Sequence, residues 1–441
     1  MFTNVVSNNK RIEKHYLYIC IILFLFEILF FILIKNEVFK SSDFLIQSSL
    51  QPNLSDNKVN EYTIPKFITF IYYSNKIFVP YIIIIIVNNY SNIYNIYTLF
   101  NILSICCYIS CMLKFIFFKM IKNDDETTRI YYCGKGWNLP STEMIISVVY
   151  SLSLWKFFFS YNYKKFIDKK TTKIIKYIIL GILIIYYIIN LIILAKIGYY
   201  LFSHLIFSAI LGVLLYLFIF ETNILRHYNS KEFCIFIKNK FERYMIIYIF
   251  LVLITFLPYI LQRKKNSYDP PDPHPIKGAS FYKNCTTFRR YVDDTFSLIA
   301  IYFAHIFVVL GIKCEHAFYF RNNILNFEQY HFGVNFDDLN LEEEPKNNSG
   351  LIVVTRETEW NNTSFFKSTI RLILSFALSG ICFLPYFLAK KEDGVYFSYI
   401  FLVKYFCSYA LFSFGITFVF KIIFRILHLS NEILGSILDD Q

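Results

Sequence analysis

Long uninterrupted runs of apolar residues, separated by polar segments, dominate the chain from end to end. A helix needs about 20 apolar residues to cross a bilayer, because a backbone in lipid must satisfy its own hydrogen bonds. The runs of this length are 16–34, 66–87, 94–118, 140–160, 174–194, 199–220, 244–261, 293–313, 369–389 and 397–425. The pattern predicts an all-α fold, a polytopic integral membrane bundle of about ten transmembrane helices.

Composition supports the membrane class. Of the 441 residues, 56% are hydrophobic, and the mean hydropathy is +0.44, well above the range of soluble domains. The first run, 16–34, is too long for the core of a signal peptide, so we expect an uncleaved first transmembrane helix. The second run is the weakest of the ten, because Lys76 interrupts it.

The net charge of +12 is concentrated between the apolar runs. Loops rich in Lys and Arg remain in the cytosol, which predicts cytosolic positions for 161–173 and 221–243 and for both ends of the chain. Basic loops of this kind contact anionic membrane lipids. No soluble basic domain is evident, and we therefore expect no nucleic-acid partner.

Cysteines and aromatic residues add no separate chemistry. The ten cysteines form no C-x-x-C pair, so neither a disulfide framework nor a metal site is expected, and no cofactor is implied. The 50 phenylalanines and 36 tyrosines suit lipid-facing and core positions.

Three longer polar segments divide the chain. They are 119–139, the proline-rich 262–292, and 314–368, which includes the acidic "FDDLNLEEEPKNNSG" and reads as an exposed loop. The predicted regions are 1–93 with a cytosolic tail and the first helices, a helical bundle at 94–261, and C-terminal membrane helices at 262–441.

Counting the spans brings four polar positions to one membrane face, the one opposite the cytosol. Each lies at the end of a predicted span on that side: Lys114, the turn at Pro140, Lys196 and His204. The sequence thus predicts a polar mouth at the exoplasmic or lumenal surface.

Two passages at this mouth carry motif-like residues: "GWNLPSTEMIIS" and "AKIGYYLFSHLIFSAILGVLLYLF". They resemble signatures of the type 2 phosphatidic acid phosphatase superfamily, most closely the sphingosine-1-phosphate phosphatases. The resemblance covers 95–430. The superfamily's middle motif, P-S-T-H or P-S-G-H, matches at Pro140, Ser141 and Thr142, while Glu143 replaces its histidine.

The other two motifs match in part. In S-R-x-x-x-x-x-H-x-x-x-D, His204 stands at the histidine and Ser208 at the aspartate, and Gly212 falls where a glycine is usual. Lys196 takes the place of the arginine with a gap that is two residues longer. In K-x-x-x-x-x-x-R-P, Lys114 stands at the lysine, but isoleucine and lysine occupy the R-P positions.

The resemblance implies a metal-independent phosphomonoesterase that forms a phosphohistidine. His204 would attack phosphorus, Ser208 would orient its ring, and Glu143 would protonate the leaving alcohol. The remaining positions would bind the phosphate oxygens: Ser141, Thr142, Lys114 and Lys196. A serine holds an imidazolium less well than a carboxylate, and losing the aspartate of a serine protease costs roughly 10⁴ in rate.

Each of these residues also has a plain structural interpretation. His204 could bond a neighbouring helix, and Pro140 and Ser141 could simply start one. Glu143 suits a helix N-terminus, where it would repel a phosphate, and the lysines could snorkel to the headgroups. Glu27 and His305 lie inside spans and are expected to be interhelical hydrogen-bond partners.

The leading functional expectation is a lipid phosphatase-like protein that acts on a sphingoid-base or similar lipid phosphate. The resemblance implies an endoplasmic reticulum membrane with the site facing the lumen. One alternative is an inactive relative that binds a lipid phosphate or a partner protein. A transporter, which would carry intramembrane charges or broken helices, is a third alternative. The oligomeric state stays open.

Overall fold

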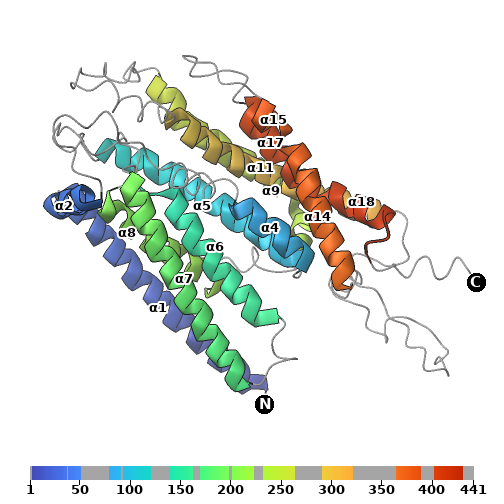
Figure 1. Cartoon of the computed structure of the whole chain (residues 1–441), viewed down its shortest axis with the longest axis horizontal. Coiled ribbons are helices and arrows are strands. Elements are labelled where there is room, and N and C mark those ends of the chain that lie inside the picture. The colour runs from blue at the N-terminus through green and yellow to red at the C-terminus, as the bar shows by residue number, and fades with distance from the viewer. Residues whose placement is uncertain are drawn as a thin grey trace, which may run out of the picture. The chain divides into compact units, whose positions relative to one another are not determined.

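The apolar runs form long helices. The structure is a computed structural model that describes residues 2–36, 38–50, 79–90, 93–120, 139–161, 169–197, 201–222, 232–263, 291–320, 364–388 and 402–430. Within these ranges every regular element is helical (Figure 1). This agrees with the all-α prediction.

The first helices are α1 (Phe2–Lys35), α2 (Lys40–Leu50), α4 (Val79–Tyr90), α5 (Ile93–Met120), α6 (Thr142–Tyr161), α7 (Lys169–Ile197) and α8 (Phe202–Phe220). The later helices are α9 (Glu232–Arg263), α11 (Tyr291–Phe320), α14 (Phe365–Cys382), α15 (Leu384–Leu388), α17 (Ser408–Phe414) and α18 (Phe420–Ile426). Two π-helical segments, η6 (Leu402–Cys407) and η7 (Gly415–Val419), flank α17.

Seven helices among the described residues are long and apolar enough to cross a membrane, so the chain is an integral membrane protein. They are His15–Lys35, Asn95–Lys114, Tyr177–Ala195, Phe202–Phe220, Leu298–Phe318, Phe365–Cys382 and Lys404–Ile426. Helices α6 and α9 occupy two further predicted runs but are not among the seven. The run 66–87 is described only from Val79, where α4 begins.

One predicted boundary is wrong. The segment 314–368 is not polar loop throughout, because α11 continues to Phe320 and α14 begins at Phe365. Helix α11 stays apolar enough to span a membrane as far as Phe318, and the polar side chains of Glu315 and His316 are buried.

The described helices group into two compact units. The first contains Met1–Tyr81, Ile102–Arg226 and Ile249–Tyr302, and the second contains Ile82–Asn101, His227–Tyr248 and Phe303–Gln441. In the first unit α8 lies beside α1, α6 and α7 (Figure 1). Its core includes Met144, Val148, Leu194, Ala195 and Leu205.

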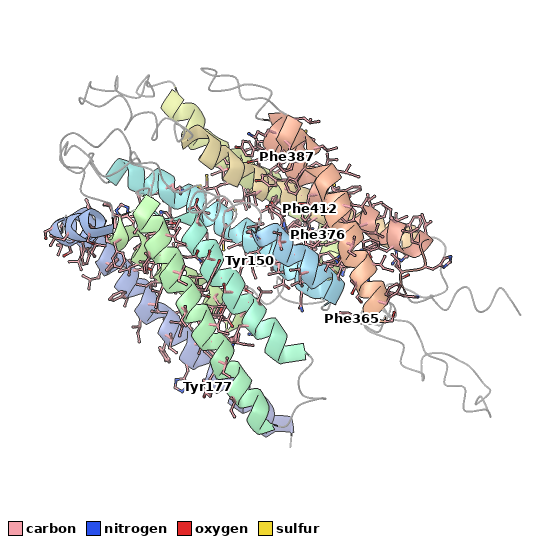
Figure 2. The ribbon with its side chains drawn as sticks, in the orientation of Figure 1. Tyr150, Tyr177, Phe365, Phe376, Phe387 and Phe412 are labelled. Atoms are coloured by element: carbon pink, nitrogen blue, oxygen red, sulfur yellow. The ribbon has the colours of Figure 1, made fainter. Side chains whose placement is uncertain are left out.

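Exposed apolar side chains cover the outside of the first unit. Tyr150 of α6 lies inside, whereas Tyr177 of α7 points outward with 61% of its surface exposed (Figure 2). Isoleucines of α7 such as Ile182 and Ile185 are similarly exposed. Outward apolar faces suit contact with lipid, because lipid tails are as apolar as the side chains themselves.

In the second unit α14 lies against α17, η7 and α18. Helix α11 packs tightly against η7 at Gly311, where an added Cβ would collide with the side chain of Thr417. The glycine therefore sets the spacing of these two helices.

Candidate functional site

The first part of the predicted site is the start of α6. Ser141 precedes the helix after a cis peptide bond between Leu139 and Pro140. Its hydroxyl oxygen accepts the N–H of Met144 at 3.4 Å, and its carbonyl accepts the N–H of Ile145 at 3.1 Å. Ser141 is thus an N-cap residue, as the structural interpretation of this position predicts.

A hydrogen bond joins this helix start to α8. The N–H of Ser141 donates to Oγ of Ser208 at 2.7 Å, and the Ser208 hydroxyl donates to the carbonyl of His204 at 2.7 Å. Ser141 and Ser208 are both fully buried. The structure therefore brings Ser141 of the middle motif into contact with Ser208 of the last motif.

Glycine allows this close approach. An added Cβ at Gly212 of α8 would lie 2.9 Å from Cβ of Val148 and 3.3 Å from the carbonyl oxygen of Ile145, both on α6. The distance of 2.9 Å is well below van der Waals contact between carbon atoms, and 3.3 Å is a tight contact with the oxygen. A larger residue would therefore separate the start of α6 from Ser208.

His204 lies in the first turn of α8, with 6% of its surface exposed. Its Nδ1 atom is buried and has no hydrogen-bond partner in the described part of the chain. The hydrogen of Ser208 is directed to the backbone carbonyl of His204, so it is not donated to the imidazole. The orienting role of Ser208 stays a prediction.

Glu143 lies beside the hydroxyl of Ser141, which donates to its Oε2 atom at 3.3 Å. Only 1% of its surface is exposed. An ionised carboxylate here is favoured by the N-terminus of α6 and repels a phosphate. Acting as a general acid would require the protonated form at working pH.

The other predicted phosphate ligands differ in how fully they are described. Lys114 of α5 and Thr142 of α6 are buried, and the Thr142 hydroxyl has no hydrogen-bond partner among the described residues. Lys196 belongs to the last turn of α7, and its side chain lies outside the described residues.

Asp43 is a site residue that sequence reasoning missed. Its carboxylate, on α2, accepts the Ser203 N–H at 2.9 Å and the Ser203 hydroxyl at 2.6 Å. The N-cap residue of α8, Leu201, has no side chain able to accept these donors, so Asp43 caps α8 from a distant segment. It thereby fixes the turn that carries His204.

Burial raises the pKa of Asp43 above its ordinary value, although both hydrogen bonds from Ser203 lower it. Burial disfavours the charged form of a carboxyl group. Asp43 is 5% exposed, which agrees with desolvation as the larger effect.

The two residues expected to form interhelical hydrogen bonds behave differently. Nε2 of His305 lies 3.0 Å from the hydroxyl of Tyr244 on α9, which confirms the prediction for His305. Glu27 of α1 is 4% exposed, and within the described residues neither of its carboxylate oxygens has a hydrogen-bond partner.

The described residues contain no group of three or more His, Cys, Asp or Glu side chains that could hold a metal ion. No family model, curated protein or solved structure matches the chain. The candidate site therefore rests on its own geometry, which is a buried histidine, two buried carboxylates and a capped helix start.

Proposed function

We propose that this chain is a lipid phosphatase-like membrane protein whose α6–α8 site engages the phosphate of a sphingoid-base phosphate or similar lipid. One observation supports the proposal above the others: the backbone N–H of Ser141 donates to Oγ of Ser208 at 2.7 Å, and Ser208 lies one turn from His204. The two segments that carry the predicted motifs are thus in contact at buried residues, which supports the proposal of one shared site.

In the catalytic form of this proposal, Nε2 of His204 attacks phosphorus and the bond from phosphorus to the lipid oxygen breaks. Protonated Glu143 gives its proton to the departing alkoxide. Water then attacks the phosphohistidine and returns a proton to Glu143, which releases inorganic phosphate and neutral imidazole. The reaction uses no redox step and no further reactant.

A second candidate is binding without hydrolysis. Two contacts favour it. The Ser208 hydroxyl donates to a backbone carbonyl and not to the imidazole, and Glu143 accepts a hydrogen bond from Ser141. An imidazole without a fixed tautomer is a poor nucleophile, and a carboxylate in place of a proton donor slows release of the alcohol. The geometry therefore favours slow or absent turnover with the phosphate site retained.

The proposal includes about ten membrane crossings, with α6, α9 and 66–87 as spans beside the seven. It also includes an endoplasmic reticulum membrane with the site facing the lumen. Its expected partners are a lipid-phosphate substrate and membrane lipids.

The test is phosphate release by purified full-length protein in detergent. The substrates are sphingosine-1-phosphate, phosphatidic acid and a generic phosphomonoester, and His204→Ala is assayed in parallel. Turnover that His204→Ala abolishes supports catalysis. Equal rates for wild type and variant on all substrates reject catalysis. Binding without hydrolysis is then tested by a direct lipid-binding experiment.

A further inference from the structure

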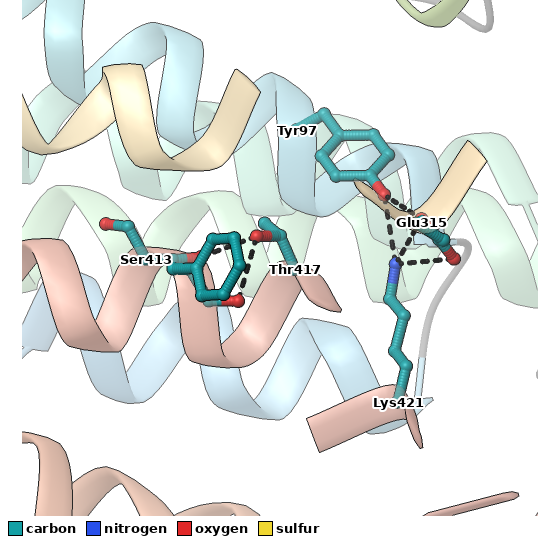
Figure 3. Close-up of polar contacts among 6 residues, drawn as sticks. Tyr97, Glu315, Ser413, Thr417 and Lys421 are labelled. Carbon is teal, nitrogen blue, oxygen red and sulfur yellow. Dashed lines mark hydrogen bonds and ion pairs between the residues drawn. The ribbon is translucent and has the colours of Figure 1, made fainter. Parts of the chain in front are cut away.

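Three polar side chains from three membrane spans meet inside the second unit (Figure 3). Nζ of Lys421 lies 2.9 Å from the hydroxyl of Tyr97 and 3.3 Å from each carboxylate oxygen of Glu315. The Tyr97 hydroxyl donates to Oε2 of Glu315 at 3.2 Å. The exposed fractions of Tyr97, Glu315 and Lys421 are only 2%, 1% and 2%.

Such an arrangement is costly as a purely structural contact. Two charges lose their hydration on burial, and an apolar pair of similar size often stabilises a fold as well or better. Ionisable residues within spans are rare and usually mark sites of ion or proton chemistry. We therefore expect Tyr97, Glu315 and Lys421 to have a functional role in addition to packing.

Further polar and charged side chains lie around the Glu315–Lys421 pair. Arg425, one turn beyond Lys421, interacts electrostatically with Glu315 and Tyr97. His316 follows Glu315 on α11 and is buried. On α14, Arg371 donates to the carbonyl of Leu429, just past the end of α18, at 3.3 Å.

A π-helical turn lies directly before Lys421. In η7 the N–H of Phe420 donates to the carbonyl of Gly415, five residues earlier, and the Thr417 hydroxyl donates to the carbonyl of Ser413 at 2.7 Å. A π turn holds one more residue than an α turn and is frequent at functional sites. Conversion to α-helix would rotate all later residues by about 100° and turn Lys421 away from Glu315.

The same two helices are in contact one turn earlier. Gly311 of α11 faces Thr417, and Glu315 and Lys421 each follow four residues later. Both contacts therefore depend on one register between α11 and the last helix. A change in the π turn would alter this register at Lys421.

We propose that Glu315, Lys421 and Tyr97 form a proton-binding latch that holds α11 against the last helix. A proton from water adds to a carboxylate oxygen of Glu315, and no other bond changes. Lys421 stays an ammonium ion, loses its counter-charge and moves to the nearby membrane surface, since long cationic side chains near helix ends reach the headgroups. This inference is independent of the proposed phosphate site.

The test uses the full chain in lipid vesicles. Infrared difference spectra between about pH 8 and pH 5 follow the C=O stretch of a protonated carboxyl group. The latch predicts a signal that grows as the pH falls, is lost in Glu315→Gln, and appears at higher pH in Lys421→Met. Glu221→Gln is the matched control, because Glu221 pairs with Lys156 at 2.8 Å in a partly exposed ion pair.

Helix movement is measured in parallel by the distance between spin labels at Phe318→Cys and Ile426→Cys, both exposed positions. The distance should change over the same pH interval as the infrared signal. The double variant Glu315→Gln/Lys421→Met removes both charges of the pair, so it is expected to fold more stably than either single variant. It should lack both the Glu315 part of the infrared signal and the change in distance. The proposal is overturned if the wild-type chain shows no pH-dependent carboxyl signal, or if that signal is just as large in the double variant. The pair would then be a fixed structural contact.

Discussion

Replacing Gly212 by alanine tests the close contact on which the α6–α8 site depends. The new methyl carbon would lie 2.9 Å from Cβ of Val148 and 3.3 Å from a backbone oxygen of α6. Relief requires movement of the backbone, because neither neighbour is the end of a flexible side chain. Overpacking of this kind costs about 1–3 kcal/mol, and the higher helix propensity of alanine offsets about 0.5–1 kcal/mol of it.

The chain supplies a matched control in Gly181 of α7, where an added Cβ meets nothing within 4 Å. Gly181→Ala gains the same propensity without overpacking. The difference between the two variants thus isolates the contact, and Gly212→Ala should be less stable than Gly181→Ala by about 1–3 kcal/mol. Reversible unfolding in detergent measures this difference, and equal stabilities would mean that α6 and α8 are not in contact at Gly212.

Three further predictions concern single polar groups. Ser208→Ala leaves a buried N–H without its acceptor and should lower the free energy of unfolding by about 1–3 kcal/mol. Ser153→Ala removes only a hydroxyl that is bonded within its own helix. It should lower the free energy of unfolding by less than about 1 kcal/mol in the same assay. Glu315→Gln should lower the free energy of unfolding by about 3–5 kcal/mol, because it breaks a buried ion pair. Glu221→Gln should lower it by less than about 1 kcal/mol, because its ion pair is partly exposed. Similar losses in the two variants would contradict the burial of Glu315. The raised pKa of Asp43 means that the folded chain binds this proton more tightly than the unfolded chain, so its contribution to stability is present at low pH and is lost as the pH rises through the folded pKa. Asp43→Asn should flatten that part of the profile of melting temperature against pH, and an unchanged profile would contradict the assignment.

Much of the helical fold follows from the sequence because lipid imposes it. Apolar runs of bilayer length must be helices, and every described helix except α2 overlaps a predicted run. Helix α2 lies between the first two runs and was not predicted. Helix ends within polar sequence are less predictable. Glu315 was placed in a loop because hydropathy gives no sign that a partner in another span will neutralise a carboxylate.

The local chemistry of the site was only partly predictable. The match to known motifs pointed to Ser141 and Ser208, which the structure joins. Asp43 was missed because it caps α8 from 160 residues away, and no sequence period relates such positions. The π turn before Lys421 was missed because hydropathy carries no information on which carbonyl a backbone N–H bonds to.

Direct lipid binding tests the central claim, that the α6–α8 site engages a lipid phosphate through His204. Calorimetry on the full-length protein in detergent would compare sphingosine-1-phosphate with sphingosine, which differ only in the phosphate. We predict that only the phosphorylated lipid binds, and that His204→Ala weakens its affinity about tenfold or more, the effect of losing roughly 1.4 kcal/mol. Equal binding of both lipids, or unchanged affinity in His204→Ala, would contradict the account.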